Sequence, residues 1–246
     1  MKKIYRKSFW LVSILFVFLV QIPNALFATH VQGGDITFKC LGGNQYQVTM
    51  SLYRDCAGVA APTSLTINVS SASCGENYTM TLNPIPNTGI EVSPICTSLK
   101  TVCTGGTFPG VQEYIYSGIT TLPKQCTDWV FSANIKARNS AISTIVDPAN
   151  QNLYIESKLN NKDFPCNNSP TFTNKPVPFI CVGEPFCFNN GALDADGDSL
   201  AYQLVTPMNG PGTTVTYIAP YSATQPLLSN PAVTFDPTRG DICMTP

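Results

Sequence analysis

Apolar and polar residues alternate along much of the chain. In the segment QYQVTMSLY at 45–53, Tyr46, Val48, Met50 and Leu52 fall on one face of an extended backbone. Polar residues fall on the other face, and a period of two predicts a strand with one buried face. The same alternation predicts core positions at Leu65, Ile67 and Val69, at Tyr78, Met80 and Leu82, at Trp129, Phe131, Ala133 and Ile135, and at Leu153, Ile155, Ser157 and Leu159.

Turn residues separate these strands. LGGN at 41–44 joins two alternating runs and predicts a β-hairpin. Short strands at regular spacing, divided by Pro, Gly and Asn, predict an all-β fold of β-sandwiches. The nearest helical pattern, RNSAISTIV at 138–146, is weakened by its β-branched residues.

A linker divides the chain into two predicted domains. The segment 161–179 holds four prolines and four asparagines between two strand-rich blocks. We expect an N-terminal β-sandwich at 29–163 and a second domain at 164–246. The second block contains short predicted strands such as SLAYQLV at 199–205, too few to close a sandwich. We therefore expect an incomplete second domain and a longer parent protein.

The N-terminus has the form of a secretory signal over residues 1–28. A basic start, MKKIYRK, precedes an apolar run of about 16 residues and small residues near Ala28. Cleavage leaves ten of the 14 basic residues against 15 acidic ones, a net charge near −5. Because the remaining basic residues are scattered, nucleic-acid binding is not expected. No later segment is long and apolar enough to span a membrane.

Cysteine usage also indicates an oxidising compartment. Ten cysteines follow the signal, and an even number in an exported chain predicts disulfides. Close spacing suggests the pairs Cys96–Cys103 and Cys181–Cys187, although sequence alone does not determine the pairing. No CxxC occurs and His30 is the only histidine, which argues against a zinc site.

No catalytic motif stands out. A Ser-His-Asp arrangement needs a histidine held by the fold, and His30 lies beside the terminus. Neither a Gly-x-Ser-x-Gly motif nor a phosphate-binding glycine loop is present. The chain is therefore predicted to be no enzyme, with one alternative open, a pair of carboxylates brought together by the fold.

Three aspartates carry the strongest signal for binding. In GALDADGDSLAYQL at 191–204, Asp194, Asp196 and Asp198 alternate with small residues. Counted from Asp194, the positions that a helix–loop–helix calcium loop gives to Gly and Glu are Ser199 and Val205, so that motif is excluded. Two interpretations remain, a polar turn before a strand or a calcium site that relieves carboxylate repulsion.

The same region resembles a cadherin-like repeat. NNSPTF, then GEPF and then GALDADGDSLAYQL follow the order of a cadherin linker, an early acidic ligand and a D-x-D element. The resemblance implies calcium ligands at Asn168, Glu184, Asp194 and Asp196, with Asp198 beside them. Asn167 stands where the family has aspartate, and Cys166 and Phe164 replace other ligands. FDPTRGDICMTP at 235–246 resembles bacterial Ig-like domains.

A wider resemblance covers residues 29–246. THVQGGDITFKCLGGNQYQVTMSLYRDC, CTDWVFSANIKARNSAIST and the 167–207 segment resemble the N-terminal region of large exported surface proteins of Bacteroidetes. Those proteins carry PKD or Ig-like domains and a gliding-motility-associated C-terminal sorting domain. The resemblance implies an adhesin-like protein.

These observations predict a secreted or cell-surface segment of tandem Ig-like or cadherin-like sandwiches. Its expected role is structural or adhesive, with a cell-surface protein or glycan as partner and calcium stiffening the junction. The main alternative is a carbohydrate-binding module of an exported hydrolase, which requires exposed aromatics including Trp129. An exported enzyme would instead show a deep pocket with two carboxylates of shifted proton affinity.

Overall fold

The computed structural model describes residues 31–96, 98–176 and 179–246. The predicted signal at 1–28 and His30 lie outside the described residues. Within them the regular structure is β-strand, apart from two single-turn 3-10 helices, Val102–Thr104 (η1) and Pro148–Asn150 (η2). The predicted all-β fold is thus confirmed.

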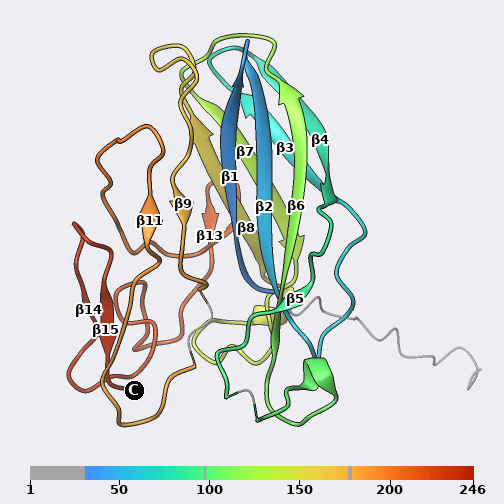
Figure 1. Cartoon of the computed structure of the whole chain (residues 1–246). Helices are drawn as coiled ribbons and strands as arrows, with labels where there is room; N and C mark the ends of the chain where they lie inside the picture. The colour runs from blue at the N-terminus through green and yellow to red at the C-terminus, as the bar shows by residue number, and fades with distance from the viewer. Residues whose placement is uncertain (1–30, 97, 177–178) are drawn as a thin grey trace, which may run out of the picture.

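Eight strands form one antiparallel main sheet (Figure 1). Its order is β1-β2-β6-β4-β3-β7-β8, and β5 pairs with β6. The strands are β1 (Val31–Gly42), β2 (Gln45–Asp55), β3 (Leu65–Ser71), β4 (Glu76–Pro84), β5 (Ile90–Glu91), β6 (Val111–Thr121), β7 (Trp129–Lys136) and β8 (Asn152–Leu159). The predicted hairpin at 41–44 joins β1 to β2.

The main sheet curls until its two end strands meet. The turn of the sheet falls between β4 and β6, which pair only at Asn83–Ser117 and Pro84–Tyr116. At the ends, β1 packs against β8, and a Cβ atom added to Gly34 would lie 3.1 Å from Cδ1 of Ile155. The result is one nearly closed, barrel-like sheet instead of two separate stacked sheets.

The alternating residues fill the inside of this curl. Tyr46, Val48, Met50 and Leu52 are all buried, as their alternation predicts. Trp129 is also fully buried, with its ring edge-on to Tyr78 at 6.3 Å between centroids. Its predicted core position is confirmed.

Beyond residue 170 the strands are short. They form three small sheets of order β10-β15-β14, β11-β9 and β12-β13, which Figure 1 shows beside the main sheet. Their bounds are β9 (Thr171–Phe172), β10 (Phe186–Phe188), β11 (Ala192–Leu193), β12 (Met208–Gly210), β13 (Thr213–Thr214), β14 (Thr234–Phe235) and β15 (Ile242–Met244). Of the residues described from 179 onward, only Gly210, Val215 and Val233 are buried.

One strand prediction in this region is wrong. SLAYQLV at 199–205 alternates as a strand would, but the segment is not a strand in the structure. The Tyr202 N–H donates to the Pro237 carbonyl at 2.9 Å, and its ring lies against Gly240. A single backbone bond to a turn does not make a ladder, so the alternation lacks a partner strand there.

Four disulfides are formed among the described residues. They are Cys40–Cys166, Cys56–Cys103, Cys74–Cys126 and Cys187–Cys243. The suggested pairs Cys96–Cys103 and Cys181–Cys187 are therefore wrong, and Cys96 and Cys181 are unpaired. The reason is topological: Cys187 on β10 faces Cys243 on β15 across a ladder, far from it in sequence.

No helix of the described ranges has both the length and the apolar character that a membrane crossing demands.

Candidate functional site: the junction at Cys166 and the covered face of the sheet

Residues 166–169 are fastened to the edge strand β1. Cys166 forms a disulfide with Cys40. The Phe38 N–H donates to Oγ of Ser169 at 2.8 Å, and the Ser169 N–H donates to the Phe38 carbonyl at 3.0 Å. An edge strand exposes backbone groups that need partners, and this segment supplies them. The predicted linker is thus bonded to the main sheet along these four residues.

Asn168 connects this edge to the loop that contains Asp194, Asp196 and Asp198, here called the aspartate loop. Its Oδ1 accepts from the Cys40 N–H at 2.8 Å. Its own backbone N–H and Nδ2 donate to the two carboxylate oxygens of Asp196, at 2.7 and 2.8 Å. We call Cys40, Cys166, Asn168, Ser169 and Asp196 the junction. Hydrogen bonds to an ionised carboxylate are stronger than neutral ones, so this contact favours one arrangement of the two segments.

The aspartate loop is closed by its own first carboxylate. Oδ1 of Asp194 accepts from the N–H groups of Asp196 and Asp198, at 2.9 and 3.1 Å. Gly197 has φ 83°, a conformation that favours glycine. This is the pattern of an aspartate-capped turn.

The structure brings together some of the predicted calcium ligands. Asn168 contacts Asp196, and Asp194 binds the backbone of Asp196 and Asp198. Glu184 lies in a different turn, where its N–H donates to the Cys181 carbonyl at 3.3 Å. Within the described ranges, no three Asp, Glu, Cys or His side chains are grouped as a metal site.

The polar groups of the junction and of the aspartate loop bond to one another in this structure. Asn168 turns its amide nitrogen toward Asp196 and its oxygen toward Cys40, whereas calcium requires oxygen ligands. N–H donors meet the carboxylates of Asp194 and Asp196. Calcium binding here stays a prediction.

A second cluster, not predicted from the sequence, lies on the outer face of the main sheet. Glu113 of β6 is 8% exposed, and its Oε1 accepts from the hydroxyl of Tyr53 at 3.0 Å. Lys175, from the segment after β9, places Nζ 2.6 Å from the same oxygen. Asp35 of β1 belongs to the same group, because the charges of Glu113 and Lys175 both act on its pKa. We call Asp35, Tyr53, Glu113 and Lys175 the outer-face cluster.

Burial governs the proton affinities in this cluster. The pKa of Asp35 is raised to about 6, first by burial and then by the charge of Glu113, while Lys175 lowers it. The pKa of Tyr53 is also raised, by burial and by the neighbouring carboxylates. A shifted carboxyl beside a second one occurs in active sites and in structural ion pairs. Here Lys175 neutralises Glu113, which is the structural arrangement.

One feature of the sequence could have indicated that this face of the sheet is covered. Tyr53 lies on the face of β2 that otherwise carries polar side chains, Val111 lies on the same face of the neighbouring strand β6, and both are buried. Large apolar groups at such positions indicate that something covers the face. The covering residue is Lys175, and sequence spacing does not predict that its segment lies on this face of the sheet.

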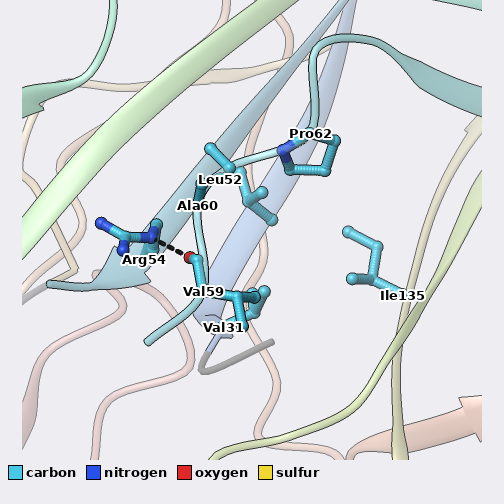
Figure 2. Close-up of a pocket in the computed structure, with 8 residues that line it drawn as sticks. Val31, Leu52, Arg54, Val59, Ala60, Pro62 and Ile135 are labelled. Carbon is cyan, nitrogen blue, oxygen red and sulfur yellow. Dashed lines mark hydrogen bonds between the residues drawn. The ribbon is translucent and has the colours of Figure 1, made fainter. Parts of the chain in front are cut away.

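Two hollows do not coincide with either cluster. The first, about 10 Å³, lies at one end of the main sheet between Val31, Leu52, Pro62 and Ile135 (Figure 2). In Figure 2 the Arg54 guanidinium beside it donates to the Val59 carbonyl. Such a volume holds about one water molecule.

The second hollow, about 450 Å³, is a surface groove beside β3, β7 and β8. Its lining includes Ser70, Asp128, Lys158 and Asn160. Hydrogen bonds from Ser71 and Ser73 lower the pKa of Asp128 to about 2, so this carboxylate is ionised at neutral pH. Asp128 is the single carboxylate among the residues that line the groove, whereas glycoside hydrolysis generally uses a pair of acids.

Comparison with known proteins gives no relative for this chain: no family model, no curated protein and no solved structure matches it. The fold and the junction define an all-β, disulfide-bonded protein, and its function must be argued from them.

Proposed function

We propose that the chain is a non-enzymatic structural or adhesion segment of a larger secreted or cell-surface protein. The single observation that carries this proposal is the path of the backbone at the Cys40–Cys166 disulfide. The identification of 164–246 as an incomplete Ig-like or cadherin-like domain, with a surface protein or glycan as partner, is part of the same proposal.

The Cys40–Cys166 disulfide lets a pulling force pass from one residue to the other without passing through the residues between them. Force applied at the start of β1 passes along the strand to Cys40 and then directly to Cys166. The sequence separation of 126 between the two cysteines is bypassed. Strand β1 is already extended, at roughly 3.4 Å per residue, and cannot lengthen much further. The part of the main sheet that follows Cys40 thereby lies outside the covalent path of a pull along the chain, which suits a spacer between an anchor and a ligand-binding part.

The compartment supports the same role. Four disulfides among the described residues require an oxidising environment in ordinary mesophilic cells. The predicted secretory signal would deliver the chain there.

Single-molecule stretching of the oxidised chain between its two ends tests the proposal. We expect the 41–165 segment to stay folded and to add no length until the force ruptures covalent bonds. In a Cys40→Ser/Cys166→Ser variant the same segment should unfold and add roughly 3.5 Å for each residue that the remaining disulfides, Cys56–Cys103 and Cys74–Cys126, do not bypass. If wild type and variant release the same length, the segment does not shield its fold from tension and the proposal fails.

The alternative of a carbohydrate-binding module requires an exposed Trp129 as a sugar-binding residue. Trp129 is fully buried and cannot stack on a sugar. The exported-enzyme alternative finds a carboxylate pair in Asp35 and Glu113, but Lys175 occupies Glu113 and neither hollow described above includes the pair. Neither alternative gains a second, independent observation.

A further inference from the structure

Two cysteines remain after the four disulfides are assigned. Cys96 follows β5 and Cys181 precedes β10, and both are exposed. An exposed thiol in an oxidising compartment is converted to a disulfide or another oxidised form. Because two cysteines are left, a further disulfide forms either between Cys96 and Cys181 or between one of them and a second molecule.

Both cysteines follow anchors on the same short stretch of β6. Oγ of Ser93, three residues before Cys96, accepts from the Val111 N–H at 2.9 Å. Lys175, six residues before Cys181, contacts Glu113 at 2.6 Å. Val111 and Glu113 are two residues apart on one strand, roughly 7 Å at ordinary strand geometry. The two loops therefore leave the sheet from neighbouring points.

The reach of the chain is sufficient for the two thiols to meet. Three residues span at most roughly 10 Å, and six span roughly 20 Å. A disulfide requires Cα atoms about 5–6 Å apart, well inside that combined range. Figure 1 shows the loop after β5 and the segment after β9 at the same end of the main sheet.

We propose that Cys96 and Cys181 form a fifth, intramolecular disulfide. In its formation the two thiols lose two protons and two electrons, and a donor disulfide, of a thiol oxidoreductase or oxidised glutathione, is reduced to two thiols. The bond joins the loop after β5 to the segment that follows Lys175. It fastens residues 164–246 to the main sheet at a second covalent point, beyond Cys40–Cys166.

Thiol counting on the exported chain tests this pairing. The protein is secreted, denatured without reductant, and its free thiols are titrated. We expect no thiol in the wild type, one in Cys96→Ser, one in Cys181→Ser and none in Cys96→Ser/Cys181→Ser. A Cys56→Ser variant is the matched control, because it must release one thiol from Cys103.

Three outcomes would overturn the proposal. Two thiols in the wild type, with one in each single variant, mean that both cysteines stay reduced. A dimer on a non-reducing gel, lost in a single variant, means that the partner is a second copy. An added mass of glutathione, seen by intact mass spectrometry, means a mixed disulfide. The proposal rests on the export of the chain, and a wild-type chain that stays inside the cell with ten free thiols would show instead that export itself is wrong.

Discussion

The carboxyl group of Asp35 couples the stability of the protein to pH. Its pKa is about 6 in the folded protein, against 3.8 for an exposed aspartate. Between these values the folded protein holds a proton that the unfolded chain has released. Stability attributable to Asp35 is therefore fully present below about pH 4 and is lost as pH rises to about 6.

Replacing Asp35 with asparagine should remove this loss. We expect Asp35→Asn to raise the free energy of unfolding at pH 7 by about 1–2 kcal/mol, since solvent access reduces the full ~1.4 kcal/mol per pKa unit. Urea denaturation at pH 4, 5, 6 and 7 measures the effect. The exposed Asp163→Asn serves as the control. An unchanged pH slope in Asp35→Asn would show that Asp35 titrates normally.

Lys175 has the opposite effect on the same cluster. Substituting Lys175→Met leaves the buried Glu113 without its cation and removes the charge that lowers the pKa of Asp35. We expect a loss of about 1–2 kcal/mol at pH 7, less than for a fully buried pair because half of the lysine is exposed. In urea denaturation, Asp35→Asn should stabilise the Lys175→Met protein by more than it stabilises the wild type, because Lys175 no longer lowers the pKa of Asp35. Full additivity of the two changes would contradict the coupling.

At the scale of elements, the edge of β1 decides how the two parts of the chain are joined. Strand β1 pairs with β2 along one side, and residues 166–169 bind its other side near Phe38 and Cys40. The extended linker that the prolines and asparagines of 161–179 indicate thus lies against this strand at residues 166–169. Proline-rich composition defines an extended backbone, but it does not determine whether that backbone lies in solvent or against a strand.

Asn168 is the central hydrogen-bonding residue of this edge. Because Asn168→Ala loses the side-chain bonds to Cys40 and Asp196, we expect a loss of about 1–2 kcal/mol and faster hydrogen exchange at Cys40. The neighbouring Asn167→Ala is the matched control, since the Asn167 amide donates only to the Asn168 carbonyl among the bonds observed. Equal effects of the two substitutions would argue against the junction.

At the scale of the whole molecule, the segment beyond residue 170 depends on the main sheet. Its strands are two or three residues long and few of its residues are buried. It is also attached to the connection between β7 and β8, where Nη2 of Arg138 donates to the Met208 carbonyl and the Val146 N–H donates to the Thr216 carbonyl, both at 2.9 Å. These contacts supply order that its own core does not.

We therefore expect a chain of residues 164–246 alone not to fold. Such a fragment buries too little apolar surface to offset the entropy of ordering its backbone. Near-ultraviolet circular dichroism should show no fixed aromatic environment, and the amide resonances should have narrow dispersion. A cooperative melting transition of the isolated fragment would instead support an independent second domain.

Calcium is best tested on the whole molecule. If the aspartate loop binds the ion, thermal melting with calcium should exceed melting with chelator by several degrees, the effect of a ligand well above its dissociation constant. The increase should vanish in Asp194→Asn/Asp196→Asn. Identical wild-type curves in the two conditions would remove calcium from the aspartate loop and leave the Asn168–Asp196 hydrogen bonds to join that loop to residues 166–169.

The sequence by itself determined the features that depend on neighbouring residues. Alternation in 45–53 places Tyr46 and Met50 in the core because successive side chains of a strand point to opposite faces. The buried Trp129 follows from the same rule. The capped turn at Asp194 was one of two local interpretations of the three aspartates; its hydrogen bonds are present, and the calcium site stays a prediction.

Only the tertiary structure decided which distant residues meet. Cys40 pairs with Cys166 across a separation of 126, and Lys175 covers Glu113 from another part of the chain. The closure of β1 on β8 and the lack of a partner strand for 199–205 are of the same kind. Such contacts depend on how the whole sheet curls and on the entropy of closing long loops, and no local pattern of side chains encodes either.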